Sequence, residues 1–174
     1  DWGDGDVTAT GLASFGVHTP SLWNVAYNRW FFWDGRADTL WSQAVQPWEH
    51  PDEMGGDRVS FTHLLRADPE LGSKYAEIFG PLPDVSGWPE AARPAGERSP
   101  DPLQRAWEGM SAQAQTDATR VIVNLAKVVA AFERRMVTTE TAFDRYVRGL
   151  RDGDPEDLAA LGEEELLGME LFFG

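Results

Sequence analysis

The stretch Gln113–Val137, QAQTDATRVIVNLAKVVAAFERRMV, is the longest segment of this chain with an uninterrupted helical pattern. Its large apolar residues recur at helical spacing: Val121, Leu125, Val128, Val129, Phe132 and Met136. Such spacing places these side chains on one face of an α-helix. The basic residues Arg120, Lys127 and Arg134 fall outside this stripe. We therefore expect one long helix whose apolar stripe packs into the protein core.

Proline, glycine and acidic residues divide the rest of the chain into shorter helices. The start signals are strongest at Asp68-Pro69, Asp101-Pro102 and Asp154-Pro155, where an acidic N-cap precedes proline. Thr141 and Asp144 together resemble a capping box. We expect a helical turn over residues 20–28 and helices over residues 37–46 (stopped by Pro47), 61–67 (capped by Ser60), 69–79, 102–110, from 142, and 155–173. Because no segment alternates apolar and polar residues for long, the chain is predicted to be all-α.

The sequence predicts a single mostly helical domain over residues 1–174 that consists of three parts. Residues 1–80 begin with an irregular segment, 1–17, and carry most of the tryptophans. Residues 81–102 hold six of the eleven prolines and are expected to form a Pro-rich surface linker or arm. Residues 103–174 form the second helical part.

Composition excludes several classes of protein. The net charge of −14 argues against binding to nucleic acid or to an anionic membrane surface. No apolar run approaches the ~18 residues that a membrane span needs. The absence of cysteine excludes disulfides and thiolate metal sites. Because the first residue is Asp, we expect that a leader was removed or that the chain was cut from a longer one.

A cluster of chemically useful residues follows the turn Phe31-Phe32-Trp33-Asp34-Gly35-Arg36. Gln43 and Pro47 lie in or at the end of the next predicted helix, and Glu53 lies in a loop bounded by Pro51 and Gly55. Loops fixed by a rigid helix often carry catalytic groups, although an acidic loop residue taken alone is usually a solvated surface group. The three histidines, His18, His50 and His63, show no metal-binding spacing.

The order of these motifs resembles that of the di-haem cytochrome c peroxidase family, including the related MauG-type oxidases. The resemblance begins at Thr19-Pro20-Ser21-Leu22 and includes the Trp-Asp-Gly-Arg and Pro-Asp-Glu-Met-Gly segments. It continues through 124–127, 130–134 and 143–146 and ends at 168–174. The resemblance implies a cytochrome c-like helical domain fragment with long loops. It also implies that this sequence lies between two Cys-x-x-Cys-His haem-attachment motifs, both of which are outside it.

The resemblance assigns a role to four residues. Glu53 corresponds to the distal acid that moves a proton between the oxygens of hydrogen peroxide, and Gln43 to an amide in the same pocket. Pro47 corresponds to a haem-pocket wall residue. Trp33 corresponds to the tryptophan between the two haems, where an indole can relay electrons; the alternative for Trp33 is a packing role in the core. We expect the four to line one side of a common cavity.

The implied parent protein is a periplasmic oxidoreductase that carries two haem c groups. It would reduce hydrogen peroxide with electrons from a small cytochrome c or cupredoxin, or oxidise another substrate at long range. At the family's calcium-ligand position, where Asn is frequent, this chain has His18. Residues 1–17 hold no distal histidine, which resembles the open MauG-type site. Without attachment motifs we expect the chain alone to be inactive. The alternative is a haem-free α-helical binding or structural module.

Overall fold

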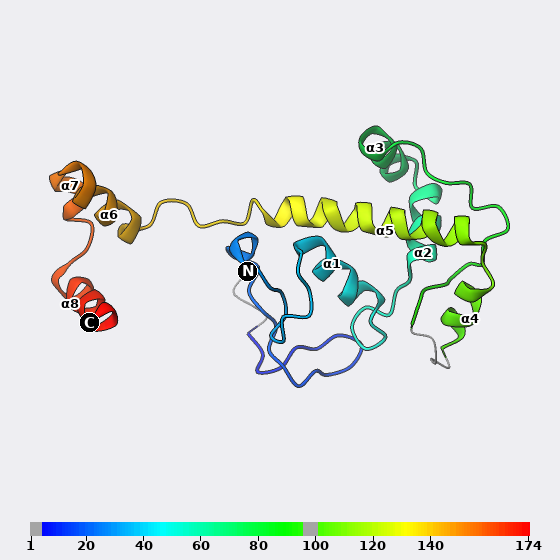
Figure 1. Ribbon diagram of the computed structural model, residues 1–174, viewed down its shortest axis with the longest axis horizontal. Helices are drawn as coiled ribbons and strands as arrows, with labels where there is room; N and C mark the ends of the chain where they lie inside the picture. The colour runs from blue at the N-terminus through cyan, green and yellow to red at the C-terminus, as the bar shows by residue number, and fades with distance from the viewer. Residues whose placement is uncertain (1–4, 96–100) are drawn as a thin grey trace. The chain divides into compact units, whose positions relative to one another are not determined.

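The computed structural model describes residues 5–95 and 101–174, which Figure 1 draws in colour. The chain divides into two compact units, Asp1–Val137 and Thr138–Gly174. The expectation of one domain over residues 1–174 stays a prediction. No helix in the described part of the chain is long and apolar enough to cross a membrane.

The described residues are helical, which confirms the predicted all-α class. The first unit contains the short 3-10 helix η1 (Val25–Tyr27) and α1 (Leu40–Glu49), α2 (Arg58–Ala67), α3 (Pro69–Phe79), α4 (Pro102–Glu108) and α5 (Ala112–Glu133). The second unit contains α6 (Ala142–Asp152), α7 (Pro155–Leu158) and α8 (Glu163–Phe173). Over residues 5–95 and 101–174 there is no strand, although isolated bridges pair Thr10 with Ser14 and Phe31 with Ala37.

The long helix α5 begins at an N-cap, Ser111, whose side chain accepts a hydrogen bond from the amide of Ala114. Its buried face differs from the predicted stripe. Val121 is fully buried, but Val128 and Phe132 are 45% and 65% exposed. The buried face is made instead largely of small residues, Ala114, Ala118, Ala126 and Ala130. The prediction was wrong at Val128 and Phe132 because α1 and α2 pack against the alanine face.

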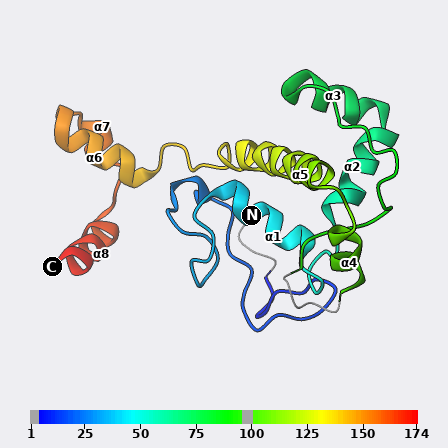
Figure 2. The same ribbon diagram turned by 45° about the vertical axis from the view of Figure 1, so that its right-hand side comes forward.

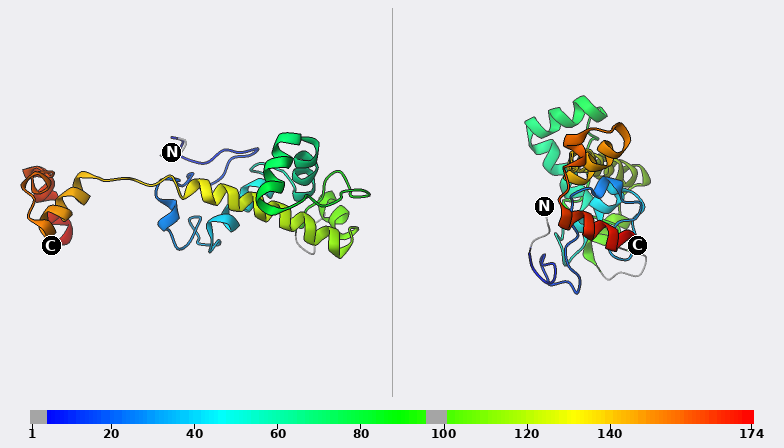
Figure 3. Two further views of the ribbon diagram at one scale, coloured as in Figure 1. Left: turned by 90° about the horizontal axis from the view of Figure 1, so that it is seen from above. Right: turned by 90° about the vertical axis from the view of Figure 1, so that its left-hand side faces the viewer.

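The core of the first unit forms where α1, α2 and α3 meet α5. Helices α1 and α2 both contact α5, as Figure 2 shows, and Figure 3 shows α2 and α3 beside its N-terminal half. Ala130 of α5 packs with Leu40 of α1 and Phe31. Val121 packs with Leu65 and Tyr75 in a second cluster. The short alanine side chains let α1 approach α5 closely and fix the helix that carries Gln43.

Helix α1 does not stop at Pro47, contrary to the prediction, but continues to Glu49. Proline lacks the amide that would donate to the carbonyl of Gln43, which normally disfavours this position. The end of the helix is satisfied by the loop that follows. The amide of Met54 donates to the carbonyl of Pro47 at 3.2 Å, and the amide of Gly56 donates to that of Trp48 at 2.8 Å.

The other predicted helices are confirmed with local corrections. Asp68 caps α3 and Pro69 is its first residue, as predicted. The cap of α2 is Asp57 rather than Ser60, because the Asp57 carboxylate accepts from the amides of Val59 and Ser60. Of the turn expected over residues 20–28, only η1 is helical. The helix expected over residues 155–173 is broken into α7 and α8.

The described part of the Pro-rich segment, residues 81–95, packs against the rest of the first unit and is most deeply buried at Ala92 and Arg93. Ala92 is fully buried, and its amide donates to the Asp57 carboxylate at 2.9 Å. Arg93 is 7% exposed and donates to the carbonyl of Glu49 at 2.5 Å. A buried Ala-Arg pair is not what a surface arm would show. Residues 96–100 of the predicted arm, and residues 1–4 of the predicted irregular segment, lie outside the described residues.

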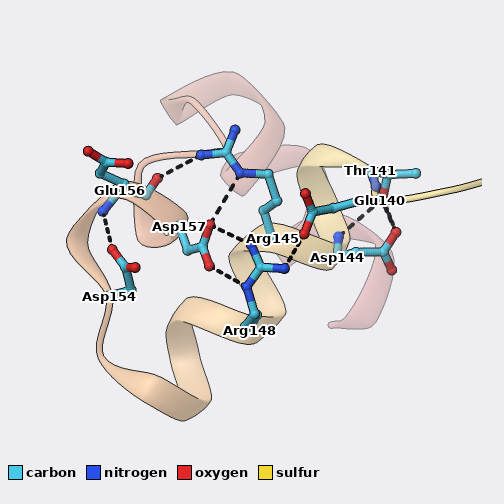
Figure 4. A network of polar contacts seen from close by, with 8 residues as sticks. All are labelled: Glu140, Thr141, Asp144, Arg145, Arg148, Asp154, Glu156 and Asp157. Atoms are coloured by element: carbon cyan, nitrogen blue, oxygen red, sulfur yellow. Dashed lines mark hydrogen bonds and ion pairs between the residues drawn. The ribbon is translucent and has the colours of Figure 1, made fainter.

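In the second unit, α6 and α7 are joined by the network of charged side chains drawn in Figure 4. Arg148 of α6 binds both carboxylate oxygens of Asp157 at 2.5 and 2.9 Å and also pairs with Glu140. Arg145 adds a contact to Asp157 at 3.2 Å. The hydrogen bonds from Arg148 are the main reason that the pKa of Asp157 lies below its ordinary value. A bidentate arginine–carboxylate pair of this kind fixes orientation as well as distance.

A buried acid at the C-terminal end of α5 leads to a prediction about stability and pH. Glu133 is 5% exposed, and one of its carboxylate oxygens has no hydrogen-bond partner. Burial raises the pKa of Glu133, with Arg134 opposing the shift. The folded state therefore holds this proton more tightly than the unfolded state. The stability that protonated Glu133 contributes to the folded state is complete below the ordinary glutamate pKa. It is lost as the pH rises through the folded-state pKa of Glu133.

Glu133→Gln is expected to raise the free energy of unfolding by roughly 1 kcal/mol at about pH 8, because a neutral amide costs less to bury than a carboxylate. The gain should shrink as the pH falls towards about 4, where the glutamate is itself neutral. Urea unfolding followed by circular dichroism measures both values. Glu77→Gln, at an exposed position of α3, is the control and should show no such gain. An equal gain at both pH values would contradict the prediction.

Candidate functional site

The first unit contains a pocket of about 590 Å³ between the N-terminal segment, the turn around Trp33 and α1. This volume lies within the range of small-molecule and cofactor sites. The pocket is lined by Ala9, Thr10, Gly11, Phe15, Val17, His18, Thr19, Pro20, Leu22, Phe32, Trp33, Asp34, Arg36, Gln43, Pro47, His50, Glu53 and Met54. The structure thus brings together all four residues that were expected to share a cavity: Trp33, Gln43, Pro47 and Glu53. Their roles stay predictions.

Helix α1 presents Gln43 and Pro47 to the pocket. The two lie four residues apart, which places them on one face of a helix, one turn above the other. Leu40 and Ala44, on the adjoining part of the same α1 surface, are both buried and anchor the helix. Because these anchors fix the rotation of α1 about its axis, the amide of Gln43 and the ring of Pro47 keep the same pocket-facing side.

Glu53 is presented by a tight loop, residues 50–57, that folds back onto the end of α1. The carbonyl of His50 accepts hydrogen bonds from the amides of Glu53 at 3.1 Å and Gly55 at 2.9 Å. Gly55 has a φ of 61°, a left-handed conformation that glycine adopts without steric cost. The Glu53 side chain is half-buried and lines the pocket. The loop therefore holds the Glu53 side chain at the wall of the same pocket that Gln43 lines.

A buried ion pair closes the base of this loop. Arg58, the first residue of α2, donates to both carboxylate oxygens of Glu49, the last residue of α1, at 2.9 and 2.5 Å. The two side chains are only 13% and 11% exposed. Arg58 also donates to the hydroxyl of Thr119 on α5 at 3.0 Å. The pair joins α1, α2 and α5 at the point where the Glu53 loop begins and ends.

Trp33 lies at the pocket with its indole 67% exposed. Its Nε1 donates to the carbonyl of His18 at 2.6 Å, which fixes the ring without burying it. The turn is closed by hydrogen bonds between the backbones of Phe31 and Ala37 at 2.9 Å and of Gly35 and Phe32 at 3.3 Å. Because Phe31, not Trp33, is the buried residue of this turn, the alternative of a core role for Trp33 is wrong.

Of the three histidines, His18 and His50 line the pocket and His63 does not. The ring of His18 is engaged through Nδ1, whose hydrogen bond the carbonyl of Asp6 accepts at 2.6 Å. His63 is half-buried, with Nε2 3.0 Å from the carbonyl of Pro89. Within the described ranges no cluster of three or more His, Cys, Asp or Glu residues could hold a metal ion. A calcium-ligand role for His18 stays a prediction.

The sequence-based reasoning missed the N-terminal wall of the pocket. Residues 9–17 were expected to be irregular, and no role was assigned to them, yet Phe15 and Val17 line the cavity. Phe15 packs edge-on against the ring of His50 with 5.5 Å between ring centroids. No periodic pattern marks this segment, because its contacts are to residues about 35 to 40 positions later in the chain. Of the glycines in this segment, Gly11 is the one at a close backbone approach and was the available signal.

Comparison with known proteins gives a consistent assignment. The methylamine utilization protein MauG of Methylorubrum extorquens is 27% identical over 175 residues, which cover 99% of this chain and 38% of that protein. Cytochrome c peroxidase Ccp of Escherichia coli is 27% identical over 172 residues, covering 97% of this chain and 28% of Ccp. MauG of Paracoccus denitrificans is 43% identical over 58 residues, 33% of this chain and 15% of that protein.

The chain spans only 38% and 28% of the length of the first two relatives, so it corresponds to one portion of such a protein. A family model described as di-haem cytochrome c peroxidase matches residues 1–152, which is most of the chain. That match agrees with the order of the Trp33, Gln43, Pro47 and Glu53 motifs and with the helical fold. The chain belongs to the di-haem cytochrome c peroxidase family.

Proposed function

We propose that this chain supplies the distal side of a peroxide-reacting haem site in a longer di-haem protein. The observation that carries the proposal is the convergence of Trp33, Gln43, Pro47 and Glu53, from a turn, a helix and a loop, on one pocket of about 590 Å³. An apolar cavity with a few convergent polar groups is the usual form of a cofactor or active site. Family membership supports haem as the cofactor.

The residues present fit one face of a haem. Phe15, Leu22, Phe32 and Pro47 provide apolar and aromatic walls for a flat macrocycle, and Glu53 and Gln43 provide its polar contacts. The chain contains no cysteine, so the thioether bonds of a haem c would come from sequence that this chain does not contain. When bound, haem supplies the iron at which hydrogen peroxide is reduced.

Glu53 is proposed to move a proton between the two peroxide oxygens. Its carboxylate accepts a proton from one oxygen and returns it to the other, so that the departing oxygen leaves as water rather than as hydroxide. Gln43, one helical turn before Pro47 and in the same pocket lining, is proposed to hydrogen-bond the same ligand. Backbone hydrogen bonds within the loop 50–57 fix the main chain that carries this acid. Reduction of hydrogen peroxide to two water molecules consumes two protons and two electrons in total.

Trp33 is proposed to relay the electrons that this reaction consumes. An exposed indole at the pocket wall, held through Nε1 by the carbonyl of His18, can lie between two cofactors without a large rearrangement. Tryptophan is the most easily oxidised side chain of the pocket lining. The proposed donor is a small cytochrome c or cupredoxin in the periplasm. MauG-type long-range oxidation of another substrate would use the same residues, with that substrate in place of the small redox protein as the source of the electrons.

The experiment that tests this function uses the full-length protein produced with a cytochrome c maturation system. We expect two haems per chain and reaction with hydrogen peroxide in stopped-flow absorbance. Addition of a reduced small cytochrome c should then produce catalytic turnover. A full-length protein that carries no haem after maturation would instead support the alternative of a haem-free α-helical module. A haem-loaded protein that is inert to peroxide would contradict the proposed reaction.

Trp33→Phe is expected to slow electron transfer between the two haems of the full-length protein by at least tenfold. Phenylalanine keeps the ring in the pocket wall but is much harder to oxidise than indole. Since Trp33 is 67% exposed, the substitution leaves the core unchanged and should have little effect on stability. Stopped-flow absorbance of both haems after peroxide addition measures the rate.

The matched control for this prediction is Trp30→Phe. Trp30 is also exposed, at 58%, and lies three residues earlier, but it does not line the pocket. Its substitution should leave the inter-haem rate unchanged. If Trp33→Phe and Trp30→Phe behave alike in well-folded, fully haem-loaded protein, the relay role of Trp33 is excluded.

A further inference from the structure

The N-terminal segment 9–17 folds into a closed loop of its own. The amide of Ala9 donates to the carbonyl of Val17 at 2.7 Å, and the amide of Phe15 donates to that of Ala9 at 2.8 Å. At its tip, the amide of Gly11 donates to the carbonyl of Ala13 at 2.9 Å. These bonds define a compact segment, which we call the N-terminal loop.

The N-terminal loop is docked on the loop that carries Glu53, where the two segments meet in Figures 1 and 2. The amide of Leu12 donates to the carbonyl of Glu53 at 2.9 Å. The amide of Ala13 donates to the carbonyl of Asp52 at 2.8 Å. Two backbone hydrogen bonds to consecutive residues fix both the position and the orientation of the peptide that bears the Glu53 side chain.

Gly11 lies at the point of closest approach between the two segments. A Cβ atom at Gly11 would lie 2.7 Å from the Cα of Glu53 and 2.8 Å from the carbonyl oxygens of Asp52 and Glu53. All three are backbone atoms, which cannot rotate away as the end of a flexible side chain can. Any side chain at position 11 would therefore displace the Glu53 backbone or separate the two loops.

Gly16 of the same loop offers a contrast. A Cβ atom at Gly16 would meet no atom within 4 Å. Neither Gly11 nor Gly16 has a positive φ, so alanine is compatible with the backbone conformation at both positions. The two glycines thus differ in one respect, the contact that Gly11 makes with Glu53.

We propose that Gly11 is a positioning residue for Glu53: its lack of a side chain lets the N-terminal loop dock on residues 52–53 and hold the Glu53 carboxylate in the pocket. This inference rests on the proposed function of Glu53. Phe15 and Val17 of the same N-terminal loop line the pocket beside Glu53. Displacements of about 1 Å at a reacting group can lower a rate about 100-fold.

The test compares Gly11→Ala, Gly16→Ala, Glu53→Gln and the double variant Gly11→Ala/Glu53→Gln in the haem-loaded full-length protein. We expect Gly11→Ala to lower the second-order rate of reaction with hydrogen peroxide about 10- to 100-fold, and Gly16→Ala to leave it unchanged. If Gly11 acts through Glu53, adding Gly11→Ala to Glu53→Gln should cause no further loss, because effects on one functional unit are non-additive.

The outcomes separate the two proposals. A Glu53→Gln variant with normal activity overturns the proposed function of Glu53, and the positioning role with it. An impaired Glu53→Gln with a normal Gly11→Ala overturns only the positioning role. Equal losses from Gly11→Ala in the parent and in the Glu53→Gln background would mean that position 11 acts through general stability, which also overturns it.

Hydrogen exchange measured by mass spectrometry gives a readout that does not depend on activity. In the parent and in Gly16→Ala, a peptide covering residues 9–17 should retain slow-exchanging amides, because Leu12 and Ala13 donate across the interface. In Gly11→Ala, exchange should accelerate in this peptide and in one covering residues 50–57, while α5 exchanges as before. Unchanged protection of both peptides in Gly11→Ala would show that the two loops accommodate the added methyl group, contrary to the proposal.

Discussion

Glu53→Gln is expected to lower the rate of reaction with hydrogen peroxide by roughly 10²–10⁴-fold in the haem-loaded full-length protein. Glutamine keeps the size and hydrogen-bonding shape of glutamate but cannot accept and return a proton, and this range is usual for the loss of a general acid–base group. The loop should fold as before, because it is closed by backbone hydrogen bonds rather than by the Glu53 side chain. Haem content should be unchanged.

Asp52→Asn is the matched control for this variant. Asp52 precedes Glu53 in the same loop, but its side chain is exposed and does not line the pocket. Its substitution removes one negative charge without touching the proposed proton path, so peroxide reactivity should remain close to that of the parent. Stopped-flow absorbance provides both rates. A Glu53→Gln rate within about threefold of the parent would remove Glu53 from the reaction.

Arg58→Met is expected to lower the free energy of unfolding by about 3–5 kcal/mol, the usual cost of removing one partner from a buried ion pair. The Glu49 carboxylate, 11% exposed, would lose both hydrogen bonds from the guanidinium. Thr119 would lose its donor, and Trp107 would lose the cation that lies 5.2 Å from its ring centroid. Urea unfolding followed by tryptophan fluorescence reports the change.

Lys74→Met provides the control, because Lys74 and Glu70 form an exposed pair four residues apart on α3. Exposed pairs of this kind contribute about 0.3–0.5 kcal/mol. The double variant Glu49→Leu/Arg58→Met should recover part of the stability lost in Arg58→Met, since it no longer buries an unpaired carboxylate. A loss in Arg58→Met no larger than in Lys74→Met would show that the Glu49–Arg58 pair does not hold the base of the Glu53 loop.

Local sequence features were sufficient to predict the helical class and most helix starts. Asp68-Pro69 and Thr141 with Asp144 satisfy the free amides of the helix that follows, so their effect is contained within a few residues. The composition of the pocket could also be anticipated, although only from the order of motifs characteristic of the family. Spacing alone accounts for Gln43 and Pro47, which a helix places on one side. Residue spacing does not predict that Glu53 and Trp33 line the same pocket as Gln43 and Pro47.

The end of α1 shows why local signals can fail. Pro47 normally terminates a helix because it lacks an amide donor. Here the loop 50–57 supplies donors to the carbonyls of Pro47 and Trp48, and the helix continues to Glu49. These bonds stabilise the last turn of α1 without replacing the hydrogen bond that proline removes at Gln43, and they depend on a loop conformation that the residues around Pro47 do not encode by themselves.

By itself, the sequence determined the elements of this protein: a helical chain, a long central helix and a set of polar groups in a fixed order. Only the tertiary structure decided that the alanine face of α5, rather than Val128 and Phe132, is buried. It alone decided that the N-terminal loop docks on residues 52–53 through Gly11. Helix caps act over one turn, whereas these contacts join segments tens of residues apart. Their free energy comes from close packing of backbones, which no periodic pattern of side chains records.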